Sequence, residues 1–77
     1  MSERYINVSI LDFGNGDISC RLTQSVDNGP LESTPISLDK ARKLQWELKL
    51  IGGSKEVYVS SLDRTIVSKN VSWLMQF

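Results

Sequence analysis

Apolar and polar residues alternate along the first third of the chain with the two-residue period of β-strands. The alternation runs over residues 5–13 and again over residues 17–26, and Gly14-Asn15-Gly16 separates the two runs. Glycine and asparagine between two alternating runs are typical of a tight hairpin turn. The sequence therefore predicts two antiparallel strands joined by a short loop.

The apolar faces of these two strands decide the register of the hairpin. A two-residue loop would pair Ile10 with Arg21 and mix core and solvent positions on one face. A three-residue loop over residues 14–16 pairs Ile10 with Cys20 and keeps the apolar side chains together. Because a slip of one residue moves every side chain to the other face, we predict the three-residue loop, with Gly16 in a left-handed conformation.

The period changes to that of a helix after residues 27–35, which are rich in turn-forming residues and are predicted to be a loop. Ser37 is a suitable N-cap, and Gly52-Gly53 is a suitable stop, so the predicted helix runs over residues 38–51. On a helical wheel, the apolar positions predicted to face the core are Leu38, Ala41, Leu44, Leu48 and Ile51.

The strand period returns after the helix. Residues 56–61 form a predicted strand, residues 62–64 a turn, and a further strand begins at Thr65. Residues 69–70 either bend this last strand or divide it, in which case residues 71–77 form a fifth strand.

These elements predict an α+β fold, a single antiparallel sheet of four or five strands with one helix packed across one face, in the order β-β-α-β-β. The chain has 77 residues, too few for two independent cores, so we expect a single domain over residues 1–77. The side chains predicted to be buried between helix and sheet are Val8, Ile10, Leu22, Leu44, Leu48, Val57 and Val59.

The net charge of the chain can be compared with that of proteins that bind or mimic nucleic acid. Nine Lys and Arg residues match nine Asp and Glu residues, so the formal net charge is zero. Dedicated nucleic-acid binders are usually strongly basic, because neutralising phosphates supplies much of their affinity. A mimic of nucleic acid would be strongly acidic. Charge therefore favours neither class.

The sequence contains no targeting signal that we recognise. Alternating residues follow Met1 in place of an apolar leader, and no stretch approaches the roughly 20 apolar residues of a membrane helix. A lone cysteine cannot form an internal disulfide, which small secreted domains usually need. We therefore expect a complete, stand-alone cytoplasmic protein without a membrane partner.

Residues that could support catalysis or bind metal are scarce. There is no histidine, the usual general base and a frequent metal ligand. Cys20 occupies the apolar face of a strand, so we interpret it as a buried structural thiol. Asp12 and Asp17 flank the hairpin loop, where carboxylates stabilise turns, and their spacing does not fit a calcium loop. No catalytic residue, metal site or cofactor is predicted.

The helix offers one candidate site for a protein partner. Trp46 and Leu50 lie one turn apart, beside Asp39 and Lys43, on the side predicted to face solvent. Tryptophan is enriched at binding hot spots. Either residues 27–35 cover Trp46, or this side of the helix binds a partner.

The C-terminal residues 73–77 are apolar on both faces. This pattern fits a central strand, or an edge strand covered by a second chain, of which a homodimer is the simplest form. Trp73 and Phe77 are therefore also candidate partner-binding residues.

The function favoured by these observations is a small non-enzymatic protein-interaction module. We expect a regulator or inhibitor that occupies a partner's surface. Genes of this size are common among accessory proteins of phages and mobile elements, including inhibitors of host defence. The alternative is a nucleic-acid-binding domain that uses one sheet face with Tyr5, Arg21, Tyr58 and Arg64. An enzyme is the least favoured class.

Overall fold

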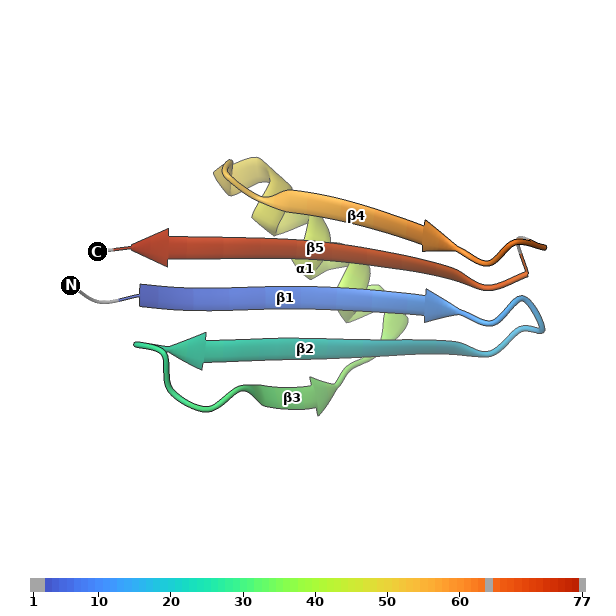
Figure 1. Cartoon of the computed structure of the whole chain (residues 1–77), viewed down its shortest axis with the longest axis horizontal. Coiled ribbons are helices and arrows are strands. Elements are labelled where there is room, and N and C mark those ends of the chain that lie inside the picture. The colour runs from blue at the N-terminus through green and yellow to red at the C-terminus, as the bar shows by residue number, and fades with distance from the viewer. Residues whose placement is uncertain (1–2, 64, 77) are drawn as a thin grey trace.

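Five antiparallel strands and one helix form the fold within residues 3–63 and 65–76, which the computed structural model describes (Figure 1). The elements are β1 (Glu3–Asp12), β2 (Ile18–Val26), β3 (Glu32–Pro35), α1 (Leu38–Ile51), β4 (Lys55–Ser60) and β5 (Val67–Gln76). In space the strands follow the order β3-β2-β1-β5-β4. The predicted α+β fold, one antiparallel sheet with a single helix packed on it, is confirmed.

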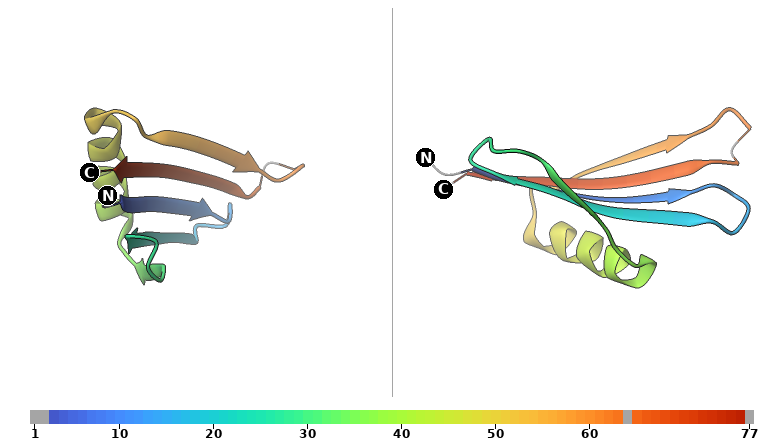
Figure 2. Two further views of the ribbon diagram at one scale, coloured as in Figure 1. Left: turned by 60° about the vertical axis from the view of Figure 1, so that its left-hand side comes forward. Right: turned by 90° about the horizontal axis from the view of Figure 1, so that it is seen from below.

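The helix covers only part of one side of the sheet (Figure 2). We call the side that α1 packs on the helix face and the other side the open face. The molecule measures 43 × 23 × 22 Å, and the β1–β2 and β4–β5 hairpins extend beyond the helix. The loops of both hairpins lie at the same end of the sheet, which we call the turn end (Figure 1).

The first hairpin has the predicted register and loop. Ile10 pairs with Cys20, and the backbone N–H of Phe13 donates to the carbonyl oxygen of Asp17 at 3.1 Å. Three residues therefore form the loop, and Gly16 has the expected positive φ, +92°. The side chain of Asn15 accepts a hydrogen bond from the Asp17 N–H, as expected of turn-stabilising residues.

The helix begins and ends where the sequence predicts. The Ser37 hydroxyl accepts a hydrogen bond from the Lys40 N–H at 3.2 Å, which is N-cap geometry, and Gly52 ends the helix with a φ of +86°. The predicted core face is wrong at its last position, because Ile51 is 63% exposed. The helix also contacts the sheet through Gln45, which is 3% exposed. The apolar pattern did not predict that this polar residue is buried.

The core lies between α1 and the middle strands. Val8 of β1 and Val71 of β5 are fully buried, and Ala41 and Leu48 of α1 pack over them together with Cys20 of β2. Partly buried residues surround this cluster: Ile6, Ile10, Leu22, Ile36, Leu38, Leu44 and Trp73. The central strands thus supply most of the apolar surface that the helix covers.

Strand β3 corrects the prediction that residues 27–35 are a loop throughout. Residues 32–35 pair with β2, with Glu32 opposite Gln24 and Pro35 opposite Arg21. All four side chains are exposed, so the strand has no apolar alternation to reveal it. Backbone pairing and hydrogen bonds to the Ser33 hydroxyl join it to β2 at the edge, and the observed order is β-β-β-α-β-β.

Strand β4 presents the face opposite to the one predicted. Val57 and Val59 were expected in the core, yet they are 51% and 58% exposed. The register places Glu56 opposite the buried Val71, so Glu56 and Tyr58 lie on the helix face and the two valines on the open face. The ion pair between Glu56 and Lys49 of α1, 2.9 Å long, fits this arrangement.

Strand β5 is continuous and central. Residues 69–70 neither bend nor divide it, since they pair with Ile10 and Ser9 of β1 on one side and with β4 on the other. Residues 67–72 of β5 lie between β1 and β4, whereas residues 73–76 pair with β1 alone. The expectation that residues 71–77 form a separate strand is therefore wrong, and the fifth strand is β3. Coverage of the C-terminal residues by a second chain stays a prediction.

Candidate protein-interaction surface

The solvent-facing side of α1 carries four of the predicted partner-binding residues. Asp39, Lys43, Trp46 and Leu50 follow one another at intervals of four, three and four residues, which places them in one row along the helix. All four are exposed, and Ala41, Gln45 and Leu48 on the other side contact the sheet. We call this row the outer stripe.

Trp46 is accessible along the outer stripe. Its side chain is 63% exposed, and that of Leu50 is 68% exposed. Residues 27–31 run past the end of β2 on the other side of the sheet from α1 (Figure 2), and Leu31 is itself exposed. The alternative in which the loop covers Trp46 is therefore wrong.

The remaining predicted partner-binding residues do not join the outer stripe. Trp73 lies on the helix face of β5 and packs, half-buried, against the core cluster. Much of the Trp73 side chain is therefore part of the core and is not free to contact a partner. Phe77 lies outside the described residues.

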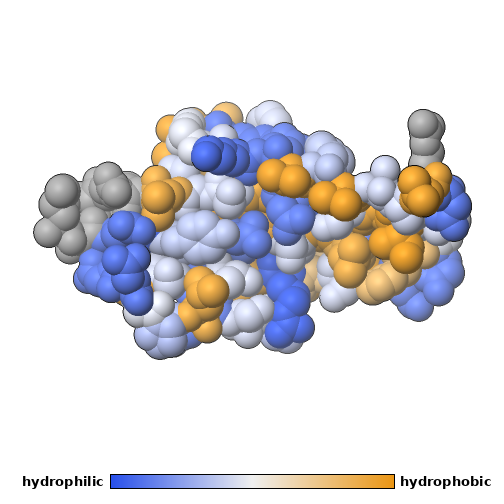
Figure 3. All heavy atoms as spheres, viewed as in Figure 1, coloured by the Kyte–Doolittle hydropathy of each residue, from blue (hydrophilic) through white to orange (hydrophobic). Residues whose placement is uncertain are grey.

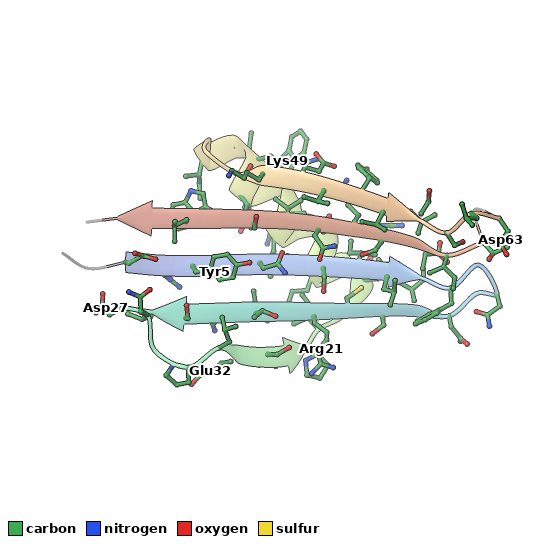
Figure 4. All side chains as sticks on the ribbon, viewed as in Figure 1. Tyr5, Arg21, Asp27, Glu32, Lys49 and Asp63 are labelled. Carbon is green, nitrogen blue, oxygen red and sulfur yellow. The ribbon has the colours of Figure 1, made fainter. Side chains whose placement is uncertain are left out.

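The predicted nucleic-acid face is not assembled as expected. Tyr5 and Arg21 belong to the open face (Figure 4), where the Arg21 Nε donates to the Ser33 hydroxyl at 2.9 Å. Tyr58 lies on the helix face, with the ammonium nitrogen of Lys69 5.4 Å from its ring centroid. The expectation that Tyr5, Arg21 and Tyr58 share one face is therefore wrong, and Arg64 lies outside the described residues.

The open face carries an apolar area that the sequence did not predict. Toward the turn end, Val57 and Val59 lie on the same face as Leu11 but across β5 from it, because Val59 and Leu11 pair with Ser68 from its two sides. Apolar residues gather there in Figure 3, and Phe13 in the adjoining loop is also exposed. We call Leu11, Val57 and Val59 the turn-end patch.

One signal in the sequence could have revealed this patch. A loop at the β4–β5 turn that pairs Ser60 with Val67 also pairs Val59 with Ser68 and Val57 with Asn70, which are polar. The register test that decided the first hairpin would therefore have placed the two valines opposite the polar side of the last strand.

Three charged residues connect the helix to the edge of the sheet. Glu56 lies between Lys49 of α1, at 2.9 Å, and Lys69 of β5, at 3.3 Å. The hydrogen bond from Lys49 is the main reason that the pKa of Glu56 is lowered. Contact with Tyr58, and then with Glu56, raises the pKa of Lys69. This group connects β4 to the helix and carries a net charge of +1.

The cysteine and the acidic side chains are the described residues that bear on metal binding and thiol chemistry. Cys20 is buried, and burial raises the pKa of its thiol, which disfavours the reactive thiolate. Residues 3–63 and 65–76 contain no group of three or more acidic or cysteine side chains placed to hold a metal ion. Within the same residues, no helix has the length and apolar character needed to cross a membrane.

Comparison with known proteins adds no family or relative. No protein-family model matches the chain, and no curated protein and no solved structure matches it significantly. Function is therefore inferred from the residues of this chain.

Proposed function

We propose that this chain is a non-enzymatic protein-interaction module, a cytoplasmic regulator or inhibitor that occupies a partner's surface with the outer stripe of α1. The observation that carries the proposal is the exposure of Trp46 and Leu50 on the side of the helix opposite the sheet. Large apolar side chains at such a position contribute little to folding, whereas tryptophan is the residue most enriched at binding hot spots.

The outer stripe has the composition expected of a helix that docks into a groove. Trp46 and Leu50 supply an apolar anchor, and they are one turn apart, so a single pocket could receive both. Asp39 and Lys43 continue the row toward the helix N-terminus with one charge of each sign. Such residues suit the polar rim that surrounds an apolar anchor. They would fix the orientation of the partner along α1.

The fold supports the helix independently of this row. Ala41 and Leu48 pack in the core, and the hydroxyl of Ser37 caps the first turn. A partner would therefore meet a preformed helix, which keeps the entropic cost of binding low.

The test compares Trp46→Ala with a matched exposed residue outside the stripe, Leu31→Ala. We expect the free energy of unfolding of both variants to lie within about 1 kcal/mol of that of the wild type, because both side chains are largely exposed. Immobilised wild type and Leu31→Ala should capture the same protein from a lysate of the source cells. Trp46→Ala should bind that protein about 30-fold more weakly, or ~2 kcal/mol.

Two results would contradict the proposal. If Trp46→Ala unfolds the protein, the side chain is part of the core. If Trp46→Ala and Leu50→Ser capture the same protein with unchanged affinity, the outer stripe is not the binding surface.

A further inference from the structure

The two edges of the sheet differ in how well they are protected from pairing with another strand. β3 has four residues and ends at Pro35, and short length and proline are both features that block strand addition. β4 has six exposed residues without proline or glycine. Its charged residues, Lys55 and Glu56, lie at its start, and Glu56 is already engaged by Lys49 and Lys69. β4 is therefore the unprotected edge.

The backbone of β4 presents a regular set of free hydrogen-bonding groups. The Ser61 N–H donates to the carbonyl oxygen of Ile66 at 2.9 Å, which makes these two residues a hydrogen-bonded pair. In an antiparallel ladder such pairs alternate along the strand, so the valines of β4 also direct their backbone groups toward β5. Glu56, Tyr58 and Ser60 consequently direct their N–H and C=O groups away from the sheet. Figure 1 shows no other ribbon alongside β4 over most of this edge.

We propose that this edge pairs antiparallel with β4 of a second copy of the chain, joining two sheets into one. The register places Tyr58 opposite Tyr58 of the second copy and Glu56 opposite its Ser60. Every outward N–H group of the three residues then meets an outward carbonyl group of the other copy. The contact is the same on both copies, as a two-fold symmetric dimer requires.

The side chains of β4 are self-complementary in this register. On the open face, Val57 of each copy lies opposite Val59 of the other, so that two pairs of half-exposed valines cover one another. The turn-end patches of the two copies become continuous across the junction. Lys55 would lie opposite Ser61, so no charge meets a like charge. These features favour a second copy over an unrelated strand as the partner.

A cysteine at the two-fold position provides the sharpest test. Residues in a hydrogen-bonded antiparallel pair have Cα atoms about 5.5 Å apart, within the range that a disulfide spans. Tyr58→Cys should therefore form a disulfide-linked dimer under mild oxidation, seen on a non-reducing gel. The wild type should not, because its Cys20 is buried. By light scattering, the wild type should have twice the 8.7 kDa mass of one chain.

Two variants, each with one added cysteine besides the buried Cys20, test the register. Glu56→Cys and Ser60→Cys each place the two equivalent cysteines four residues apart along the strands, roughly 13 Å, too far for a bond. Neither variant should cross-link alone, but an equal mixture of the two should. Cross-linking of Glu56→Cys alone as fast as Tyr58→Cys would overturn the register.

A charge at the junction tests the dimer without oxidation. Val59→Lys changes an exposed side chain, so the fold should persist, while the lysine replaces an apolar contact on both sides of the two-fold axis. We expect this variant to be a monomer and Trp46→Ala to remain a dimer. A monomeric wild type, or a dimer lost in Trp46→Ala and kept in Val59→Lys, would overturn the inference. The proposed function of the outer stripe is tested separately by partner capture.

Discussion

The side-chain nitrogen of Gln45 lies 3.0 Å from the backbone carbonyl oxygen of Val8 and donates a hydrogen bond to it inside the core. The same nitrogen lies 3.3 Å from the carbonyl oxygen of Lys69. One polar side chain of α1 thus contacts the backbones of both central strands, β1 and β5. This contact fixes the helix across the middle of the sheet more specifically than apolar packing alone would.

Gln45→Ala should lower the free energy of unfolding by about 1–3 kcal/mol, because it removes a buried hydrogen bond and leaves a small cavity. Gln45→Met should cost less than about 1.5 kcal/mol, since methionine fills a similar volume. The carbonyl oxygens would keep their hydrogen bonds within the sheet. Urea denaturation of both variants measures the difference. Equal destabilisation by Met and Ala would show that the hydrogen bond, and not the volume, dominates.

Leu48→Ala should lower the free energy of unfolding by about 2–5 kcal/mol, because Leu48 packs in the core and its loss leaves a cavity beneath α1. The matched control is Ile51→Ala, three residues along the same helix, at a side chain that is mostly exposed. This control should stay within about 1 kcal/mol of the wild type. Thermal melts of the two variants compare them directly. A larger loss at Ile51 than at Leu48 would contradict the observed orientation of the helix.

The sequence could predict the elements whose pattern is local. The hairpin register followed from the faces of Val8, Ile10, Cys20 and Leu22, and the helix limits followed from Ser37 and Gly52. These features need only the residues on either side of a turn or at the ends of a helix. The helical wheel likewise placed Trp46 opposite Leu48, away from the sheet, but it left open whether residues 27–35 cover the side chain.

The features that the sequence did not predict depend on contacts between distant segments. Gln45 is buried because two strands happen to offer carbonyl oxygens beneath it, and a polar residue carries no apolar signal. β3 is held by backbone pairing to β2 and by side-chain hydrogen bonds to the Ser33 hydroxyl, neither of which leaves an apolar pattern in the sequence. The valines of β4 belong to the open face because β5 presents polar residues there. The register of the last hairpin could have placed Val57 and Val59 on the open face, but the position of Leu11 across β5 and the free edge of β4 follow only from the strand order.

Gly14 and Gly16 lie in the same loop, but the structure requires glycine at the two positions for different reasons. Both have positive φ, so alanine at either position should cost about 1–2 kcal/mol of unfolding free energy. A Cβ at Gly14 would in addition overlap the backbone oxygen of Thr65 in the neighbouring hairpin, whereas a Cβ at Gly16 meets open space. Gly14→Ala should therefore be clearly the less stable variant. Asn15→Asp, which keeps a side-chain acceptor for Asp17, is the control and should be nearly neutral. Equal melting temperatures for the two alanine variants would contradict the contact between the hairpins.

Asp63 should make the stability of the β4–β5 turn depend on acid pH. Its Oδ1 atom accepts hydrogen bonds from the hydroxyls of Ser61, at 2.6 Å, and Thr65, at 2.8 Å, and from the Thr65 N–H, at 3.1 Å (Figure 4). The Ser61 bond, followed by those from Thr65, lowers the pKa of Asp63 from 3.8 to about 2. A pKa lowered by folding means that the ionised carboxylate stabilises the folded state.

This stabilisation is fully present above the unfolded pKa near 3.8, and it is lost as the pH falls toward the folded pKa of about 2. Asp63→Asn keeps the size of the side chain and removes its charge. We expect the variant to be less stable than the wild type at pH 7 and the difference to shrink as the pH approaches 2. Urea denaturation of both proteins at a series of pH values measures the difference directly, since every other carboxylate is common to both. A difference that stays constant between pH 7 and pH 2 would show that the charge of Asp63 does not support the turn.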